Sequence, residues 1–315
     1  MKNRNVWLPI LSGILALVVE DLIGNSSKHT PAKHPYFIYF MIGLIAIFTI
    51  IAIISYFNPK LKAWAQENSL FIAAMILFLN VLNIVTKKMA LLPVIFFPSL
   101  DKVLGVIIED WAFLATCLAA SGKLLFTGCI FGAIAGFVTG IGVGFSKSAA
   151  YWVNPLIRIL GPIPPTAWIP LVLISFPTTF SGSSFLIALA VWFPTAVMTS
   201  SGILNVQNAY FEVSSTLGAG KYYQIFKVGI PAAMPHMFIG LFNGTCASFI
   251  TLMTAEMLGV KNGIGWYINW QKDMMAYANV YAGLIIIAVT FYILITLLFK
   301  VRDYLLVWQK GVIKW

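Results

Sequence analysis

The sequence predicts an all-α integral membrane protein, a polytopic bundle of about eight transmembrane helices. Of its 315 residues, 60% are hydrophobic and only 10% are charged, and the mean hydropathy is +0.90. Soluble domains carry about 25% charged residues, so this chain has too few charges to cover a water-exposed surface. The composition excludes a disordered chain, a coiled coil, a nucleic-acid-binding domain and an ordinary cytosolic enzyme. The net charge of +10 agrees with basic loops on the cytoplasmic side of a membrane.

The predicted spans are apolar runs near the length of about 20 residues that crosses a bilayer core as a helix. The clearest runs cover residues 36–57, 124–145, 185–204, 236–258 and 280–300. Weaker runs cover 70–85, which contains asparagines, and 163–180, which contains several prolines. The weakest run, 8–23, follows a basic N-terminus and resembles a signal sequence. Because no small-x-small cleavage site follows it, we expect an uncleaved anchor helix.

The segment 92–123 is predicted not to span the membrane. We expect a short helix at the outer interface there, with an apolar stretch around Trp111–Ala119. For the chain as a whole, we expect residues 1–90 to form extra N-terminal transmembrane helices. Residues 91–315 would then form the functional body, with a cytoplasmic loop at 205–235.

The distribution of charge predicts a multi-pass protein of the inner (plasma) membrane with both termini in the cytoplasm. In the eight-helix arrangement the cytoplasmic side holds 12 of the 20 basic residues and three acids, a charge of +9, which leaves +1 of the total +10 outside. This bias has the sign of the positive-inside rule, so the basic excess reflects topology rather than affinity for nucleic acid. Lys87 and Lys88 fall on the outer side, against the rule.

A ladder of glycines occurs every four residues in the run 124–145. This spacing puts the glycines along one ridge of a helix, where the missing side chains let another helix approach closely. Tight packing within the subunit is the first interpretation, and a contact between two subunits or a sliding surface is the alternative. Neither interpretation involves catalysis. The helix-packing residues are Gly128, Gly132, Gly136, Gly140 and Gly144.

A polar stripe follows the run 236–258, mostly at every third residue. Polar groups inside a membrane face protein or water, so the stripe forms either interhelical hydrogen bonds or the lining of a solute path. Glu256, near the outer end, is ionisable and is by default a functional candidate, with a paired or snorkelling carboxylate as the alternative. The candidate path residues are Asn243, Thr245, Ser248, Thr251, Thr254 and Glu256.

The loop 205–235 carries the most specific pattern. Two short amphipathic helices joined at Gly218 fit it, because glycine allows a sharp backbone turn. Its apolar side chains would form an exposed surface for a soluble partner, with a solvated linker as the alternative. These side chains are Leu217, Tyr222, Tyr223 and Phe226.

We expect no metal and no nucleotide site in this chain. The cysteines form no C-x-x-C pair and the histidines have no metal-site spacing, so Cys117, Cys129 and Cys246 are interpreted as small packing residues. The stretch from Gly218 to Lys221 looks like the end of a P-loop, which requires Gly-x-x-x-x-Gly-Lys-Ser/Thr. Ser215 and Tyr222 stand where that motif requires glycine and Ser/Thr, so ATP would be bound elsewhere.

The loop 205–235 and several other stretches resemble a known family, the ABC importer permeases of the nitrate, sulfonate, taurine and bicarbonate type. The loop is similar to their EAA motif, Glu-Ala-Ala, three residues, Gly, nine residues, Ile-x-Leu-Pro. Three further stretches resemble family segments in the same order, over about residues 92–310. The matching loop residues are Glu212, Val213, Ser214, Gly218, Val228, Ile230 and Pro231, and the stretches are Phe97-Pro98-Ser99, PIPPTAWIPL from Pro162, and AEMLG from Ala255 with Gly263-Ile264-Gly265.

The resemblance implies a type I ABC importer permease core preceded by extra helices. Two permease copies, a homodimer by preference, would enclose a solute path. Separate ATPase subunits, which bind the ATP and Mg²⁺, would dock on the loop, and a solute-binding protein would deliver the substrate. No cofactor is implied in this chain, which would not itself be an enzyme. The expected ATPase-coupling residues are Glu212, Ser215, Leu217, Gly218, Ala219, Tyr222, Tyr223, Phe226 and Pro231.

Two other functions remain as alternatives. A secondary transporter or channel would work without an ATPase, and such proteins more often show inverted repeats and buried charges at mid-membrane. A membrane scaffold subunit would also use a long cytoplasmic loop but would leave the ordered motifs unexplained. The resemblance favours small oxyanions or organosulfonates as substrates, with aromatic vitamin precursors as a further option.

Overall fold

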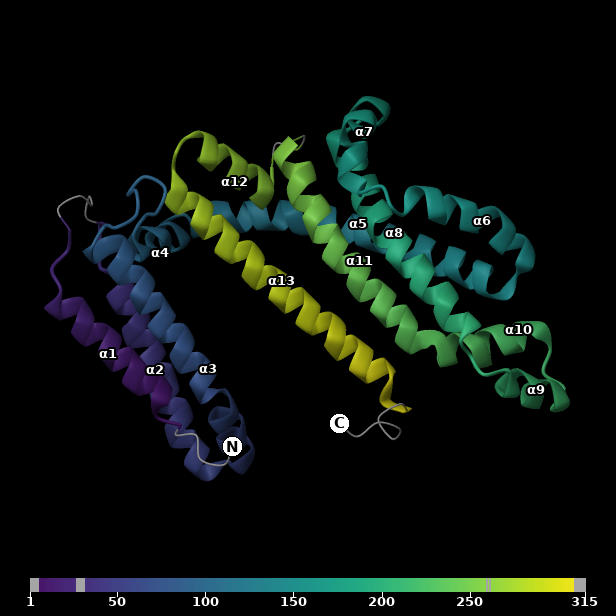
Figure 1. The fold of residues 1–315 in the computed structure, drawn as a ribbon, viewed down its shortest axis with the longest axis horizontal. Helices are drawn as coiled ribbons and strands as arrows, with labels where there is room; N and C mark the ends of the chain where they lie inside the picture. The colour runs from purple at the N-terminus through teal and green to yellow at the C-terminus, as the bar shows by residue number, and fades with distance from the viewer. Residues whose placement is uncertain (1–5, 27–31, 259, 261, 309–315) are drawn as a thin grey trace. The chain divides into compact units, whose positions relative to one another are not determined.

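The computed structural model describes residues 6–26, 32–258, 260 and 262–308, and every regular element in these ranges is a helix (Figure 1). The predicted all-helical fold class is confirmed. The chain divides into two compact units, residues 1–113 with 270–282 (the first unit) and residues 114–269 with 283–315 (the second unit). The predicted boundary between residues 90 and 91 stays a prediction. The helices are α1 (Leu8–Leu22), α2 (Tyr36–Phe57), α3 (Pro59–Asn83), η1 (Ile84–Lys88), α4 (Leu100–Glu109), α5 (Trp111–Phe145), α6 (Lys147–Leu160), η2 (Pro165–Trp168), α7 (Ile169–Ser175), α8 (Thr179–Leu204), α9 (Asn208–Thr216), α10 (Lys221–Tyr223), η3 (Gln224–Gly229), α11 (Ile230–Leu258), α12 (Ile264–Asp273) and α13 (Tyr277–Leu305).

Among the described residues, six helical stretches are long and apolar enough to cross a membrane. They are α2, α3 with η1, α5, α8, the stretch Lys221–Met257 and α13. A seventh span results if α6 and the η2–α7 segment, bent by 85°, are counted as one. The predicted eighth span at 8–23 is instead the 15-residue α1, which extends about 22 Å. That length is less than the roughly 30 Å of a bilayer core.

The predicted non-spanning segment 92–123 is contradicted from Trp111 onward, where the apolar stretch Trp111–Ala119 belongs to a long helix. Trp111 begins α5, which continues without a break for 35 residues because the segment contains no proline to interrupt its backbone hydrogen bonds. The short helix in this region is α4, with 10 residues. Likewise, the predicted span at 70–85 begins earlier, at Pro59, where the Asn58 side chain accepts hydrogen bonds from the backbone amides of Lys60 and Leu61.

In the first unit, α1, α2 and α3 lie side by side around a small apolar core (Figure 1). Ala16, Phe37, Met41 and Ile76 are its buried residues. Asn80, one of the asparagines that interrupts the apolar run of α3, donates from Nδ2 to the carbonyl oxygen of Ala16 at 3.2 Å. A polar side chain inside the membrane thus joins α3 to α1.

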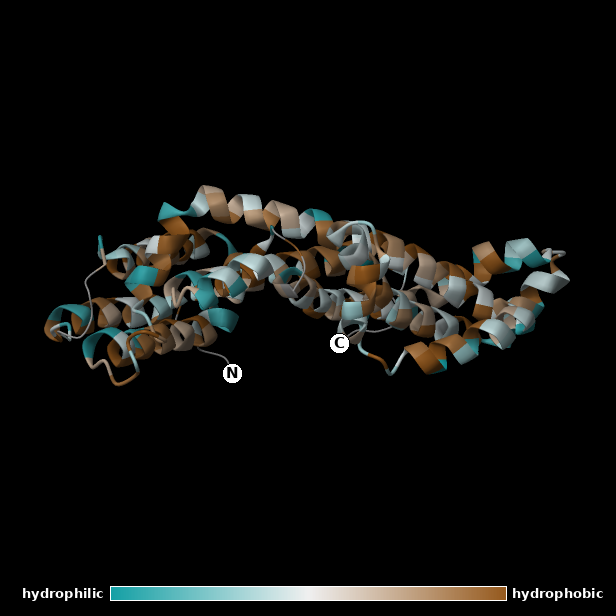
Figure 2. Cartoon of the chain, turned by 90° about the horizontal axis from the view of Figure 1, so that it is seen from above, coloured by the Kyte–Doolittle hydropathy of each residue, from teal (hydrophilic) through white to brown (hydrophobic). Residues whose placement is uncertain are grey.

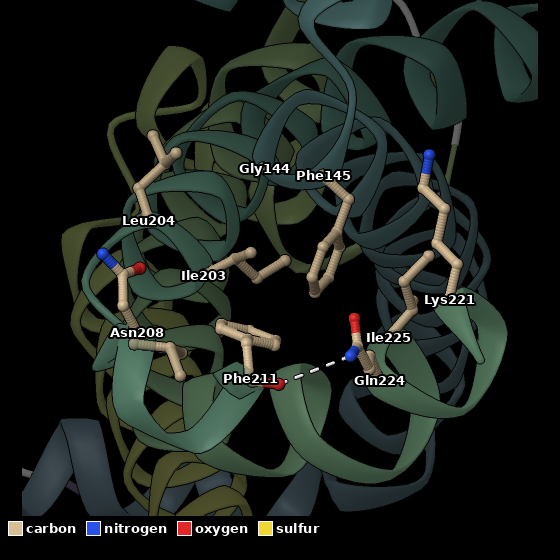
Figure 3. A pocket seen from close by; sticks show the side chains of 10 residues that line it. Gly144, Phe145, Ile203, Leu204, Asn208, Phe211, Lys221, Gln224 and Ile225 are labelled. Atoms are coloured by element: carbon tan, nitrogen blue, oxygen red, sulfur yellow. Dashed lines mark hydrogen bonds between the residues drawn. The ribbon is translucent and has the colours of Figure 1, made fainter. Parts of the chain in front are cut away.

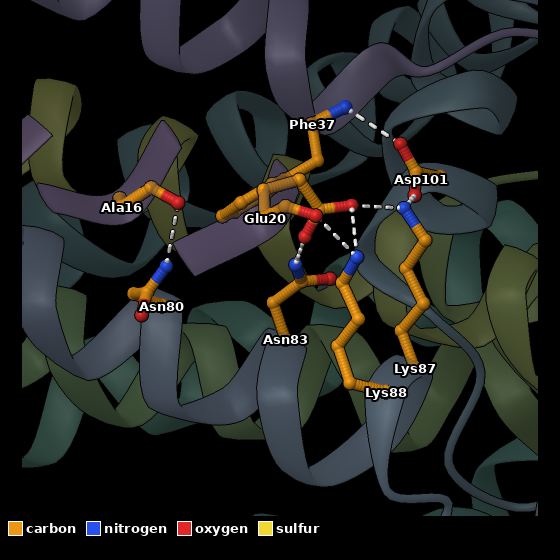
Figure 4. Close-up of polar contacts among 8 residues, drawn as sticks. All are labelled: Ala16, Glu20, Phe37, Asn80, Asn83, Lys87, Lys88 and Asp101. Carbon is orange, nitrogen blue, oxygen red and sulfur yellow. Dashed lines mark hydrogen bonds and ion pairs between the residues drawn. The ribbon is translucent and has the colours of Figure 1, made fainter. Parts of the chain in front are cut away.

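Charged side chains are buried where α1, η1 and α4 meet in the first unit (Figure 4). The ammonium of Lys87 lies 2.5 Å from Glu20 Oε1 and 2.7 Å from Asp101 Oδ2. The ammonium of Lys88 donates to the carbonyl oxygen of Glu20 at 2.6 Å and lies 3.2 Å from Glu20 Oε1. Two ammonium groups therefore face two carboxylates, and burial is tolerated because each charge has partners.

The carboxylates of this cluster also accept hydrogen bonds from uncharged N–H groups. Asp101 Oδ1 accepts from the backbone amide of Phe37 at 2.8 Å, at the start of α2, and Glu20 Oε2 accepts from Asn83 Nδ2 at 2.6 Å (Figure 4). This explains why Lys87 and Lys88 depart from the positive-inside rule. Their charges are neutralised inside the protein instead of being placed in a loop.

In the second unit, the ladder glycines of α5 pack against α8 of the same chain. Each faces the residue 59 positions later: Gly128 faces Ile187, Gly132 faces Val191, Gly136 faces Thr195, Gly140 faces Thr199 and Gly144 faces Ile203. Since both numbers rise together, α5 and α8 run parallel. A Cβ atom at Gly136 would lie 2.7 Å from Thr195 Cβ, so only glycine permits this approach.

A parallel pair of spans needs a return crossing between them. The chain from Phe145 to Thr178 provides it with α6, η2 and α7, which the prolines at 162, 164, 165 and 170 break into short pieces. The predicted span at 163–180 is thus the second half of a bent pair. None of the residues of α6 is buried within the chain.

The remaining spans of the second unit alternate in direction. Gly240 of α11 packs against Met198 of α8, and Gly244 packs against Val191, so these two helices are antiparallel. Aromatic pairs, Phe242 with Phe299 and Phe249 with Phe291, show that α13 is antiparallel to α11. The three cysteines are free thiols on these packed helices.

Apolar residues are spread along the long helices, and the most hydrophilic residues lie mostly near helix ends (Figure 2). Large apolar side chains on these helices are exposed, for example Ile47 on α2, Phe131 on α5 and Ile293 on α13. Such faces are stable in lipid, where the surroundings are as apolar as the side chains. The predicted cytoplasmic residues Lys2, Arg4, Lys310 and Lys314 lie outside the described residues.

Candidate functional site

A helical hairpin, residues 208–229, connects α8 to α11 in the second unit. Its first arm is α9, its turn covers residues 217–220, and its second arm is α10 followed by the π-helix η3, which continues directly into α11. As the sequence predicts, two short helices meet at Gly218. The second arm is therefore continuous with α11, and residues 205–207 join the first arm to α8, which packs closely against α11.

Gly218 ends the first arm in a left-handed conformation, with φ of +81°. The amide of Ala219 donates to Ser214 O at 3.0 Å and the amide of Gly218 to Ser215 O at 2.9 Å, the two hydrogen bonds of a Schellman motif. A Cβ atom at Gly218 would meet nothing within 4 Å. The requirement for glycine is thus conformational and not steric.

Replacing Gly218 by alanine should loosen the turn while leaving the rest of the protein intact. The left-handed conformation costs a residue with a Cβ atom about 1–2 kcal/mol. Gly220 is the matched control, because its φ of −71° suits any residue and its Cβ would also meet nothing within 4 Å. We expect faster protease cleavage within 208–229 for Gly218→Ala than for Gly220→Ala, measured by mass spectrometry. Equal cleavage would show that the turn does not depend on glycine.

The two arms are joined by a polar contact. Gln224 Nε2 of the second arm donates to Ser215 Oγ at 2.6 Å and to Phe211 O at 3.4 Å. The Phe211 ring packs edge-on against Phe145, the last residue of α5, with 6.2 Å between ring centres. Phe145 also lies against Gly229, where a Cβ atom would be 3.0 Å from Phe145 Cε1. The hairpin is thereby held against the end of α5.

A cavity of about 300 Å³ lies between the hairpin and the ends of α5 and α8 (Figure 3). Its walls combine aromatic and aliphatic side chains with polar groups, among them Lys221 and Asn208. This cavity has no signal in the sequence, because its walls come from three separate parts of the chain. The lining residues are Gly144, Phe145, Ile203, Leu204, Val206, Asn208, Phe211, Lys221, Gln224 and Ile225.

The face of the hairpin turned away from the spans is apolar and exposed. Leu217 and Tyr222 are 82% and 81% exposed, and Tyr223 and Phe226 are also exposed. Exposed apolar side chains that gather on a water-facing surface are typical of protein contacts. Of the other expected coupling residues, Glu212 and Ser215 are exposed, Ala219 is half-buried, and Pro231 lies half-buried in the first turn of α11.

The structure does not gather the candidate path residues around one opening. Asn243 is exposed, Thr245 and Thr254 are half-buried, and Ser248, Thr251 and Glu256 are buried. The hydroxyls donate to carbonyl oxygens of their own helix three or four residues back: Thr245 to Leu241, Ser248 to Thr245, Thr251 to Ala247 and Thr254 to Ile250. These internal hydrogen bonds are what allow the stripe to pack against apolar neighbours.

Glu256 is fully buried and binds the start of another helix. Its Oε2 accepts from the backbone amide of Gly265 at 2.8 Å, in the first turn of α12, where a carboxylate complements the helix dipole. The Ser121 hydroxyl oxygen of α5 accepts a hydrogen bond from the preceding amide, that of Ile264, also at 2.8 Å. A Cβ atom at Gly263 would lie 2.6 Å from Glu256 Oε2. In the sequence, the glycines at 263 and 265 are the signal that could indicate this contact. No sequence pattern marks Ser121 as part of it.

Comparison with known protein families matches residues 128–307 to the family described as "Binding-protein-dependent transport system inner membrane component". The matched residues include the glycine ladder, the bent pair, the hairpin and the polar stripe. The fold is similar to that of a chain in the inward-facing crystal structure of the MetNI methionine ABC transporter, with a TM-score of 0.55 and 15% identity over 62% of this chain and 98% of that chain. At this identity the likeness concerns the fold alone.

Three curated relatives are similar to this chain in sequence. They are the taurine transport system permease protein TauC of Escherichia coli, 29% identical over 58% of this chain and 66% of TauC; the nitrate import permease protein NrtB of Leptolyngbya laminosa, 30% identical over 53% and 62%; and the bicarbonate transport system permease protein CmpB of Synechococcus elongatus, 32% identical over 50% and 56%. The chain thus spans between 56% and 66% of the length of these relatives.

Proposed function

Because the chain belongs to the family of binding-protein-dependent transport system inner membrane components, we propose that it is the permease subunit of an ATP-binding-cassette importer. In this proposal the permease forms the path for a small solute that a substrate-binding protein delivers. Separate ATPase subunits bind ATP and Mg²⁺ and supply the energy. A second copy of the permease completes the path.

The observation that carries the proposal is the exposed apolar face of the 208–229 hairpin. A soluble partner can bury Leu217 and Tyr222 there without disturbing the fold, since these side chains make the outer surface. The Schellman motif and the Gln224–Ser215 hydrogen bond hold the face in one shape. A preorganised docking surface loses little conformational entropy on binding.

The packing behind the hairpin supports the transmission of movement from an ATPase to the spans. The second arm continues into α11, and residues 205–207 join the first arm to α8. α8 and α11 approach closely at Gly240 and Gly244. The glycine ladder joins α5 to α8 at five positions. Displacement of the hairpin would therefore move α5, α8 and α11 together, because close-packed helices shift as units.

For the substrate we propose a small oxyanion or organosulfonate. The printed names of the relatives, which are taurine, nitrate and bicarbonate permeases, support this class. Asn243, exposed on α11, is the residue of the polar stripe best placed to line a path. The buried members of the stripe, such as Ser248 and Glu256, would affect transport through the packing of α11.

The proposal is tested by changing the docking face. Leu217→Asp should abolish co-purification with the cognate ATPase, because the change places a charge in a contact that excludes water. Met274→Asp is the matched control, since Met274 is also apolar and exposed but lies between α12 and α13, away from the hairpin in the chain. Transport of the solute without any ATPase would instead establish the alternative, a secondary transporter or channel. ATPase binding that survives deletion of residues 211–227 would overturn the proposed function.

A further inference from the structure

A second cavity, the α5–α11–α13 groove, opens on the surface of the spans in the second unit and has a volume of about 330 Å³. The groove follows Leu294 to Val301 along α13, a length of about 10 Å. Its lining comes from three spans and is apolar except for one hydroxyl. The lining residues are Leu125, Phe126, Cys129, Ile130 and Ala133 of α5, Phe238, Leu241 and Thr245 of α11, and Leu294, Leu297, Leu298 and Val301 of α13.

The groove begins at Leu294 of α13, beside a buried apolar cluster. At that level, Leu294 and Phe291 still pack against the buried cluster around Leu125 and Phe249. Further along, α13 remains in contact with α11 through the stacked rings of Phe242 and Phe299. α5, α11 and α13 therefore all line the groove, and α11 and α13 remain in contact beside it.

Water and the proposed solute are poor occupants of this groove. A buried water needs two to four polar partners, and the single hydroxyl, that of Thr245, already donates to Leu241 O at 2.8 Å. A small oxyanion needs charged or N–H donors, and the described lining side chains offer none. The occupant must be apolar.

The side chains at the mouth of the groove indicate lipid rather than another helix. Phe126, Ile130, Leu297 and Val301 are each 44–56% exposed and are bulky. Where spans of this chain pack closely, as along the α5–α8 ladder, the contact is made by glycine, and small residues are the general rule at such contacts. A flexible acyl chain fits between bulky side chains, whereas a second helix does not approach closely across them.

The groove also lies at the right depth. It ends at Val301, whose chain neighbours are the exposed Lys300 and the half-buried Arg302. Arg302 forms an ion pair with Asp303. Basic residues at the end of a span lie at the level of phosphate headgroups. Because α13 and α11 are antiparallel, the end of α13 lies beside the first half of α11. The hairpin leads into the start of α11, so the groove lies on the hairpin side.

From these observations we propose that the α5–α11–α13 groove is a lipid-binding site, which holds an acyl chain of a phospholipid from the leaflet on the hairpin side. The bound chain fills the space between α5 and α13. It thereby couples the position of α13 to that of the helices that carry the hairpin. The proposal is independent of the transported solute and of the ATPase.

The test uses the full chain, with whichever subunits co-purify, in vesicles of phosphatidylethanolamine and phosphatidylglycerol that contain a phospholipid with a diazirine on its acyl chain. After illumination, mass spectrometry maps the adducts. We expect adducts on the lining segments of α5 and α13 about tenfold above those on the exposed face of α2, formed by Ile42, Ile47 and Ile50, which reports contact with bulk lipid. An adduct yield in the groove that is no higher than the yield on α2 would overturn the proposal. A second copy of the chain that covers the groove would give this result.

Two variants of α5 sharpen the test. Ala133→Phe places a ring in the groove and should remove most of the groove adducts. Ala135→Phe, an equal change at an exposed position of the same helix outside the lining, should leave them unchanged. Equal adduct yields in the two variants would contradict the proposal. If Ala133→Phe does not fold, the map of the unaltered protein still decides the question.

Discussion

Gly132→Val should destroy the fold of the second unit. A Cβ atom at this position would lie 2.8 Å from Val191 Cβ and 2.9 Å from Ala188 Cα, so the new side chain meets backbone that cannot rotate away. Overpacking of this kind costs about 3 kcal/mol or more when the surroundings cannot relax. The ladder has five such contacts in register, and separating the helices at one would weaken its neighbours. We expect loss of monodisperse protein in detergent, measured by size-exclusion chromatography and thermal unfolding.

Gly122→Val is the matched control for the ladder. Gly122 lies on the same helix, and a Cβ atom there would meet nothing within 4 Å. Both changes introduce the same β-branched side chain, and both raise helix propensity slightly, because valine is a better helix former than glycine. If the two variants were equally stable, close packing of α5 on α8 would not be what the ladder provides.

Lys87→Met should destabilise the first unit strongly. The change removes one of two ammonium groups and leaves Asp101, which is 2% exposed, without its ion-pair partner. Breaking a buried ion pair by removing one member costs about 3–5 kcal/mol, since the remaining charge stays buried. We expect a clear fall in the unfolding temperature and faster proteolysis of α1 to α4.

The double variant Lys87→Met/Asp101→Asn separates charge imbalance from loss of packing. It keeps Lys88 opposite Glu20, and the asparagine can still accept the hydrogen bond from the Phe37 amide. Stability should recover in part relative to Lys87→Met. Lys62→Met serves as a control, because Lys62 is exposed near the start of α3. A loss of stability as large in Lys62→Met would mean that the buried cluster is not the cause.

Three features of the fold follow from local sequence: the turn at Gly218, the exposed side chains of the second arm and the span at 36–57. The turn at Gly218 was predictable because a left-handed residue ends the helix within its own hydrogen bonds. The exposed Tyr222 and Phe226 followed from the amphipathic pattern of the same arm. The span at 36–57 agrees with α2, since a helix of this length and composition needs no partner to be stable in a bilayer.

Other features depended on contacts between distant residues. The ladder predicted a close helix contact, but only the structure shows that its partner is α8, 59 residues further along. Glu256 is a candidate for the path from its position in the sequence, and only the structure shows that it binds the first turn of α12. Lys87 and Lys88 departed from the positive-inside rule, and their partners Glu20 and Asp101 lie on other helices.

By itself, the sequence determined that the chain is a helical membrane protein, where most of its spans lie, and which loop presents an apolar hairpin. These properties follow from composition, apolar run length and single-residue backbone preferences, all of which act locally. Only the tertiary structure decided that α5 and α8 are parallel, that the buried lysines are neutralised, and that α13 leaves a groove beside α5. Each of these depends on packing between residues far apart in the chain, such as Asn83 with Glu20, 63 positions apart, and Ile264 with Ser121, 143 positions apart.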